Sequence, residues 1–499
     1  MKITGEKNLK INSEDFNLKL FINIFSNLLG KIWSFTSIYL FVPKYISFLG
    51  VEAYGVVAFY SAFISILVLA DAGFSAAFLR EVARKRNDLV YIRSILYALE
   101  PFYFLIGLLV FSLTFLLSGW IASDWLSTGS STPSEDVRFS IIIMGGVAAF
   151  QLFSSLYNAG LMGAERHALA NSNQVVFSTI RSGIVLLPLY FFHDLKVFFV
   201  WQLFSTLFYF LYLRQLVWKL FGGKCGGKRE FKILKPMSGY AIGIASVAII
   251  AALNTNLDKL IVSKLLPLSI FSKYSTLSLI SQVPAIICLP IAIALLPRFT
   301  KWVEEDNYEL IKKTYFIFSY LIAIISCSVA FSIAVDPSYL IKLWTGNENL
   351  AQNINFPVYV LLLGSVFLAL QYMPYHLAIA NGHNRTNIVL GFFCLLFTPG
   401  LTAFLIIKYG LSGATISWLL VNGVSCFILG FVYTKKFMKI NPLKWFCLCL
   451  ILPVVIIVIS GTLAKNSFTS LPEIIHMGVI GFMCLIAGLL FYPLLIKLI

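Results

Sequence analysis

Apolar residues fill fourteen long segments of this chain, and short polar or charged stretches separate them. The segments cover residues 20–43, 52–79, 95–119, 139–163, 172–192, 197–220, 237–263, 270–296, 314–334, 356–380, 387–407, 412–434, 443–463 and 474–496. Most are about 20 residues or longer, which as α-helix crosses the roughly 30 Å hydrocarbon core of a bilayer. The pattern predicts an all-α integral membrane protein with about 14 transmembrane helices, or about 12 if two weaker segments merge or lie flat.

The composition supports this membrane location. Hydrophobic residues make up 59% of the chain and charged residues 12%, whereas soluble domains are about half apolar and about a quarter charged. The polar residues 1–19 lead into the first segment without a signal-peptide cleavage site, so we expect an uncleaved tail. Seven of the eight cysteines fall inside apolar segments. Because no Cys or His spacing suits a metal, we expect no metal and no cofactor.

The placement of the basic residues predicts the orientation of the chain. The net charge of +16 would suggest nucleic acid in a soluble protein, but here it follows the membrane. With the N-terminus inside, the inside segments hold 27 Lys and Arg residues, including Arg214, and the outside segments hold 8. By the positive-inside rule, both termini are predicted to be cytoplasmic.

A weak internal repeat predicts two lobes. After six segments comes a Gly-rich basic stretch at 221–232, typical of a flexible linker. With a shift of 220 residues, Leu40–Lys44 lies over Leu260–Lys264 and Tyr54 over Tyr274. Two pseudo-symmetric six-helix bundles would enclose a site between them. The predicted parts are a cytoplasmic tail (1–19), an N-terminal lobe (20–220), a basic linker (221–236), a C-terminal lobe (237–434) and an extra hairpin (435–499).

Polar side chains recur every three or four residues on several predicted spans, so each set shares one helix face. Charges at membrane depth are costly and usually face a bundle interior or a wet cavity. We therefore predict a water-filled cavity with three cations, Lys31, Arg181 and Lys259. Packing between helices is the alternative for such polar stripes. The polar lining is predicted to include Asn23, Asn27, Ser34, Gln174, Ser178 and Asn254.

Four further ionisable residues lie inside predicted spans. Asp71 could pair with a cation from another span or cap local structure at Gly73. Asp258 is a candidate charge partner or coupling site, although with Lys259 it could instead lie at the outer interface. Glu100 and His376 are candidates for proton or cation coupling, with a structural role as the alternative.

Enzyme motifs are missing from the sequence. There is no Walker A motif, nucleophile elbow or HExxH, and no outside loop is large enough to bind a sugar donor. The chain is therefore not expected to be an enzyme. The pattern argues against an ATP-driven pump and disfavours a polysaccharide polymerase or ligase.

Three stretches of the chain resemble one family of transporters. They are FVPKYISFLGVEAYGVVAF with LVLADAGFSAAFLREVAR, then LNTNLDKLIVSKLLPLSIFSKYSTLSLISQVPAIICLPIAIALLPRFTKW, and IIKYGLSGATISWLL. These stretches are similar to Wzx-type polysaccharide (O-antigen) flippases, which share a superfamily with MATE multidrug exporters and the lipid II flippase. The resemblance covers roughly residues 15–435 and rests on LG-x-x-x-YG, D-x-G and DK patterns.

The resemblance implies transport of an undecaprenyl-diphosphate-linked oligosaccharide repeat unit from the cytoplasmic to the periplasmic leaflet of the inner membrane. It also implies alternating access of two six-helix lobes, coupling to H⁺ or Na⁺, and polysaccharide polymerase machinery as a candidate partner. Lys31, Arg181 and Lys259 would hold the anionic headgroup. The rival functions are a multidrug or cation exporter of the same fold, a polymerase or ligase, and lipid II flipping.

Overall fold

The computed structural model is built of helices joined by short connections. It describes residue 30, residue 33 and residues 35–71, 73–127, 132–223, 231–467 and 471–493, and these ranges contain no β-strand. Within them, thirteen helices are long and apolar enough to cross a membrane. The predicted all-α membrane fold is confirmed.

The thirteen candidate spans match thirteen of the fourteen apolar segments. The remaining segment, 20–43, lies largely outside the described residues, and its end continues into the shorter apolar helix Phe35–Leu49. The spans are Val51–Asp71, Leu89–Trp125, Ser134–Gly163, His167–Phe192, Leu195–Leu220, Lys232–Leu265, Val283–Glu304, Tyr308–Ala334, Asn355–Ala380, Arg385–Tyr409, Leu411–Met438, Pro442–Ser467 and Glu473–Leu490.

The chain forms two compact units that alternate along the sequence. Unit 1 consists of residues 1–49, 67–121 and 135–248, and unit 2 consists of residues 50–66, 122–134 and 249–499. Helix α9 (Lys235–Leu265) contributes its first part to unit 1 and its second part to unit 2.

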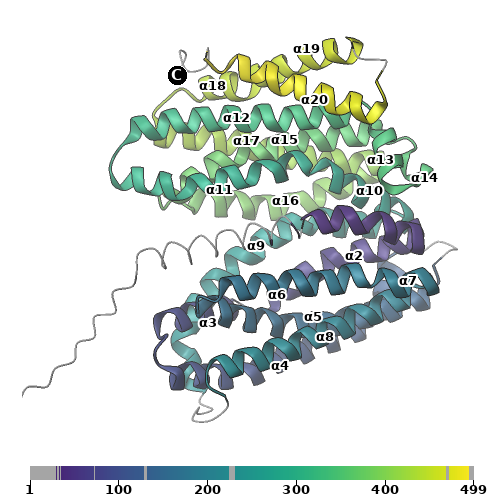
Figure 1. Cartoon of the computed structure of the whole chain (residues 1–499), viewed down its shortest axis with the longest axis vertical. Coiled ribbons are helices and arrows are strands. Elements are labelled where there is room, and N and C mark those ends of the chain that lie inside the picture. Colours follow the sequence, from purple (N-terminus) through teal and green to yellow (C-terminus); the bar gives the residue numbers. More distant parts are fainter. Residues whose placement is uncertain are drawn as a thin grey trace, which may run out of the picture. The chain divides into compact units, whose positions relative to one another are not determined.

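Unit 1 is built of long helices (Figure 1). Side chains at several helix N-termini accept hydrogen bonds from backbone N–H groups that have no partner within the helix. At the start of α4 (Leu89–Trp120), for example, the Asp88 carboxylate accepts a hydrogen bond from the backbone N–H of Tyr91 at 3.0 Å. Its core contains the fully buried rings of Phe78, Tyr103 and Phe199. Besides the helix Phe35–Leu49, the elements are η1 (Val68–Asp71), α3 (Phe74–Arg84), α4 (Leu89–Trp120), α5 (Ser134–Gly163), α6 (His167–Thr179), η3 (Ile180–Ile184), α7 (Leu186–Phe192), α8 (Leu195–Leu220) and η4 (Phe231–Leu234).

Unit 2 holds the C-terminal helices, of which α11, α12, α15, α16 and α17 lie side by side (Figure 1). The last hairpin packs against α12 through small residues, since a Cβ at Gly461 would lie 2.3 Å from the Phe331 ring. The elements are α2 (Val51–Leu67), η2 (Ile121–Trp125, which begins in unit 1), α10 (Leu268–Ser281), α11 (Val283–Glu304), α12 (Tyr308–Ala334), α13 (Pro337–Thr345), α14 (Glu348–Ala351), α15 (Asn355–Ala380), α16 (Arg385–Tyr409), α17 (Leu411–Met438), α18 (Pro442–Phe446), η5 (Cys447–Ile451), α19 (Leu452–Ser467) and α20 (Glu473–Leu490).

Two predicted spans are interrupted in the structure. The segment 52–79 breaks after η1, because Gly73 has a φ of 75° and a Cβ there would lie 2.3 Å from the Ala241 carbonyl oxygen. The segment 270–296 breaks at Gln282, after which α11 begins at Val283 with Pro284 in its first turn. The first break lies where the sequence analysis considered local structure at Gly73, whereas the second was not predicted.

Candidate functional site

Arg181 is a basic residue inside a membrane-spanning helix of unit 1. It lies in η3, a single π-helical turn that joins α6 to α7 within the span His167–Phe192. The side chain is half-buried. Among the described residues, no acidic group lies within ion-pair distance of its guanidinium, and none accepts a hydrogen bond from it.

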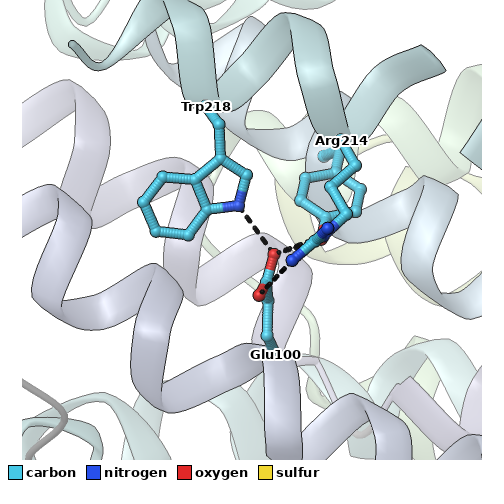
Figure 2. A network of polar contacts seen from close by, with 4 residues as sticks. Glu100, Arg214 and Trp218 are labelled. Atoms are coloured by element: carbon cyan, nitrogen blue, oxygen red, sulfur yellow. Dashed lines mark hydrogen bonds and ion pairs between the residues drawn. The ribbon is translucent and has the colours of Figure 1, made fainter. Parts of the chain in front are cut away.

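A second arginine of unit 1, Arg214 on α8, is held by an acid. Its Nε donates to Oε1 of Glu100 on α4 at 3.0 Å, and its Nη2 donates to Oε2 at 3.2 Å. Figure 2 shows this ion pair beside Trp218, whose Nε1 donates to Oε1 of Glu100 at 2.7 Å. The Tyr157 hydroxyl donates to the same oxygen at 2.6 Å. The carboxylate of Glu100 thus has four donors from two other helices.

Asp71 ends η1 at the break before α3. Its carboxylate accepts hydrogen bonds from the backbone N–H of Ser75 at 3.3 Å, the Ser75 hydroxyl at 2.9 Å and the Tyr103 hydroxyl. No Lys or Arg among the described residues forms an ion pair with it. These contacts are those of a carboxylate at a helix N-terminus, where the backbone N–H groups favour negative charge.

Asp258 lies on the part of α9 that belongs to unit 2. It is 7% exposed, and its Oδ2 accepts from the Tyr274 hydroxyl at 2.7 Å. Its Oδ1 is buried without a hydrogen-bond partner among the described residues. The adjacent Lys259 is half-buried. Asn254, one turn earlier, donates to the Gly391 carbonyl on α16 at 2.9 Å, so it joins two helices.

The other predicted lining residues differ in their surroundings. Gln174 is exposed, and the Ser178 hydroxyl donates to the Val175 carbonyl of its own helix at 2.9 Å. His376 is buried, with Nδ1 2.7 Å from the Tyr372 carbonyl oxygen of the same helix. Four predicted residues lie outside the described ranges, namely Asn23, Asn27, Lys31 and Ser34.

Within each unit, the described charged candidates differ in their hydrogen-bond partners. The partners that define the surroundings of these candidates were not predicted from the sequence, namely Tyr103, Tyr157, Arg214, Trp218 and Tyr274. Only Arg214 had a local signal, because it is a charge within an apolar segment, although the charge pattern placed it among the cytoplasmic residues. Within the described ranges, no group of three or more His, Cys, Asp or Glu residues could hold a metal ion.

Comparison with known proteins gives a consistent result. The family model described as "Polysaccharide biosynthesis protein" matches residues 20–303. A Shigella flexneri protein named "Putative O-antigen transporter" is 22% identical over 396 residues, which cover 78% of this chain and 91% of that protein.

Two solved structures share the fold. The lipid II flippase MurJ in an inward closed conformation matches with a TM-score of 0.74 and 15% identity, over 93% of this chain and 99% of that one. An inward-facing multidrug resistance MATE family transporter matches with a TM-score of 0.66 and 14% identity, over 81% of this chain and 94% of that one. At these identities the likeness concerns the fold alone.

Proposed function

The chain belongs to the polysaccharide biosynthesis protein family, and we propose that it is a flippase for an undecaprenyl-diphosphate-linked oligosaccharide. It is a multi-pass membrane protein, and its relatives are transporters and flippases. The proposed cargo is an O-antigen repeat unit or a related surface polysaccharide unit. The proposed direction is from the cytoplasmic to the periplasmic leaflet of the bacterial inner membrane, with both chain termini in the cytoplasm.

The observation that carries this proposal is the half-buried Arg181, whose guanidinium has no acidic partner among the described residues. A charge within a membrane span is costly and is usually retained for function. The planar guanidinium presents several N–H donors that match phosphate oxygens in pairs. In a family of polysaccharide transporters, a diphosphate headgroup is the anion that such a side chain would bind. Lys31 and Lys259 are proposed to add positive charge to the headgroup site.

Alternating access driven by an ion gradient is part of the proposal. Asp71 and Asp258 support this part of the proposal. Each carboxylate accepts a hydrogen bond from a tyrosine hydroxyl, and neither has a cation within ion-pair distance in the described part of the chain. Such carboxylates can take up H⁺ or Na⁺ during the cycle. Glu100 is a weaker candidate because Arg214 already neutralises it. His376 remains a candidate, with its Nδ1 held by its own helix.

The same two carboxylates favour a second candidate function, a multidrug or cation antiporter of the same fold. Cationic substrates would bind to acids such as Asp71 and Asp258, and Arg181 would repel them. The two functions predict opposite effects of removing the Arg181 charge. Headgroup binding by a flippase would weaken, whereas cation export would be unchanged or faster.

The test is complementation of a bacterial strain that lacks its own O-unit flippase, with surface polysaccharide as the readout. Arg181→Ala, Lys31→Ala and Lys259→Ala are compared with Arg138→Ala, which alters an exposed arginine of α5. We expect the first three variants to lose surface polysaccharide at wild-type membrane levels and the control to retain it. Full complementation by all three would overturn the cationic headgroup site.

A further inference from the structure

The π-helical turn η3 changes the direction of the helix that bears Arg181. A π-turn contains one residue more than an α-helical turn, so it rotates the following helix face by about 100°. It also replaces regular i to i+4 hydrogen bonds with i to i+5 bonds, and the extra residue can leave a backbone carbonyl oxygen without a partner in the helix. In a membrane, no bulk water can donate to such an oxygen. Other protein groups must therefore stabilise the turn.

Three consecutive carbonyl oxygens of η3 accept hydrogen bonds from side chains. The Trp201 Nε1 donates to the Ile180 carbonyl at 3.0 Å, and the Gln202 Nε2 donates to the Arg181 carbonyl at 3.1 Å. The Tyr45 hydroxyl donates to the Ser182 carbonyl. Gln202 is only 3% exposed, so its amide has little access to solvent. Three side chains from outside the turn therefore hold the backbone around Arg181 by hydrogen bonds.

The three donors come from two helices, and one of these helices also packs a side chain against the turn. Trp201 and Gln202 are neighbours on α8, while Tyr45 lies on the helix Phe35–Leu49. One helical turn before Tyr45, Phe41 packs on the same turn, since a Cβ at Gly183 would lie 2.9 Å from the Phe41 Cζ. Residues four apart share a helix face, so Phe41 and Tyr45 contact η3 together.

We propose that Tyr45, Trp201 and Gln202 are positioning residues that fix the π-turn and thereby aim the Arg181 guanidinium at the diphosphate of the lipid-linked substrate. This inference rests on the proposed function, because it takes the Arg181 charge as part of the headgroup site. A guanidinium that is already held in position loses less conformational freedom when it binds a phosphate than a mobile guanidinium does. The three donors act on the substrate only through Arg181.

Conservative variants test the proposal by removing one donor at a time. Tyr45→Phe keeps the ring that lies edge-on to Phe198, Trp201→Phe removes the indole N–H, and Gln202→Met replaces the amide with an apolar chain. The matched control is Trp33→Phe, which removes an indole donor to the Thr179 hydroxyl at 2.8 Å, just before the π-turn.

The measurement is binding of undecaprenyl diphosphate to the purified full-length protein in lipid nanodiscs. We expect each of the three variants to weaken binding several-fold, up to about tenfold, since each loses one hydrogen bond that fixes the turn. Trp33→Phe should bind like the wild type. Wild-type binding by all three variants would overturn the proposal. If an α8 variant cannot be purified in folded form, the binding of Tyr45→Phe alone decides the test, because this variant retains its ring packing.

A double-mutant cycle distinguishes positioning from a general structural effect. If the donors act through Arg181, adding each variant to Arg181→Ala should weaken binding no further. Additive losses would overturn the proposal. If Arg181→Ala alone leaves binding unchanged, the headgroup site of the proposed function fails. If Arg181→Ala abolishes binding while the donor variants do not, only the positioning role fails.

Discussion

Arg181 and Arg214 lie in membrane-spanning helices of the same unit, yet their surroundings are opposite. Arg214 donates two hydrogen bonds to the carboxylate of Glu100, which also accepts from Tyr157 and Trp218. Arg181 has no acidic partner among the described residues and sits in a turn whose backbone is held by other side chains. The same residue type therefore joins two helices through an acid at one position, and at the other it has no acidic partner among the described residues.

The difference shows that burial of a charge does not by itself identify a functional residue. A buried ion pair with complete hydrogen bonding fixes helices to each other, and removal of one partner is costly. A charge without a partner at membrane depth is costly, and such a residue usually marks a functional site. Variants of the two arginines and their neighbours should therefore separate stability from transport.

The largest effect on stability is expected from Glu100→Gln. This change leaves the Arg214 charge without its counter-ion, although the Arg214 side chain is 34% exposed and so keeps some solvent contact. We expect the free energy of unfolding to fall by about 2–3 kcal/mol. Thermal unfolding of the purified protein in detergent measures the change.

Two further variants serve as controls for that loss. Glu165→Gln removes an ion pair to Arg86 in which both side chains are more than half exposed, and the expected change is about 0–1 kcal/mol. The double variant Glu100→Gln with Arg214→Met should recover part of the stability, because it removes the uncompensated charge. Equal unfolding temperatures for Glu100→Gln and Glu165→Gln would contradict the structural role of the network.

A smaller loss is expected from Trp218→Phe. The variant keeps an aromatic ring beside Tyr97 but removes the N–H that donates to Glu100 at 2.7 Å. A hydrogen bond to a charged group contributes about 1.5–3 kcal/mol, and three donors remain, so we expect a loss of about 1–2 kcal/mol. Transport per folded molecule should stay at the wild-type level. A transport defect without a stability defect would assign the network to the transport cycle.

Asp258→Asn should have the smallest effect on stability, within about 1 kcal/mol, because an amide oxygen can still accept the Tyr274 hydroxyl. Unlike Glu100, Asp258 has a buried oxygen without a partner among the described residues. We expect the variant to transport at the rate seen without an ion gradient, and no longer to respond to H⁺ or Na⁺ gradients in proteoliposomes. A normal gradient response would remove Asp258 from the coupling site.

The sequence was sufficient to predict the helical membrane fold, because the length and apolarity of a span are local properties. Asp71 and Gly73 indicated local structure within the segment 52–79, whereas the break at Gln282 was not predicted although Pro284 lies two positions later. The bend at Gly73 depends on the close approach of Ala241, which lies 168 positions later in the chain. A helix irregularity of this kind is set by tertiary packing rather than by local propensity.

The site was predicted less completely than the fold, for the same physical reason. The presence of Arg181 and Glu100 within apolar segments marked both as costly charges. Their difference depends on Arg214, which is 114 positions from Glu100, and no local pattern reveals that contact. The π-turn at Arg181 was also unpredicted, since the donors that hold it come from two other helices.

The most direct test of the account is binding of undecaprenyl diphosphate to the wild-type protein, Arg181→Ala and Arg138→Ala, at matched folded protein in nanodiscs. Loss of charged hydrogen bonds to the diphosphate should weaken binding by Arg181→Ala about tenfold or more. The exposed Arg138 should make no difference, and the unfolding temperature of Arg181→Ala should stay close to that of the wild type. Equal affinity of Arg181→Ala and the wild type would contradict the account.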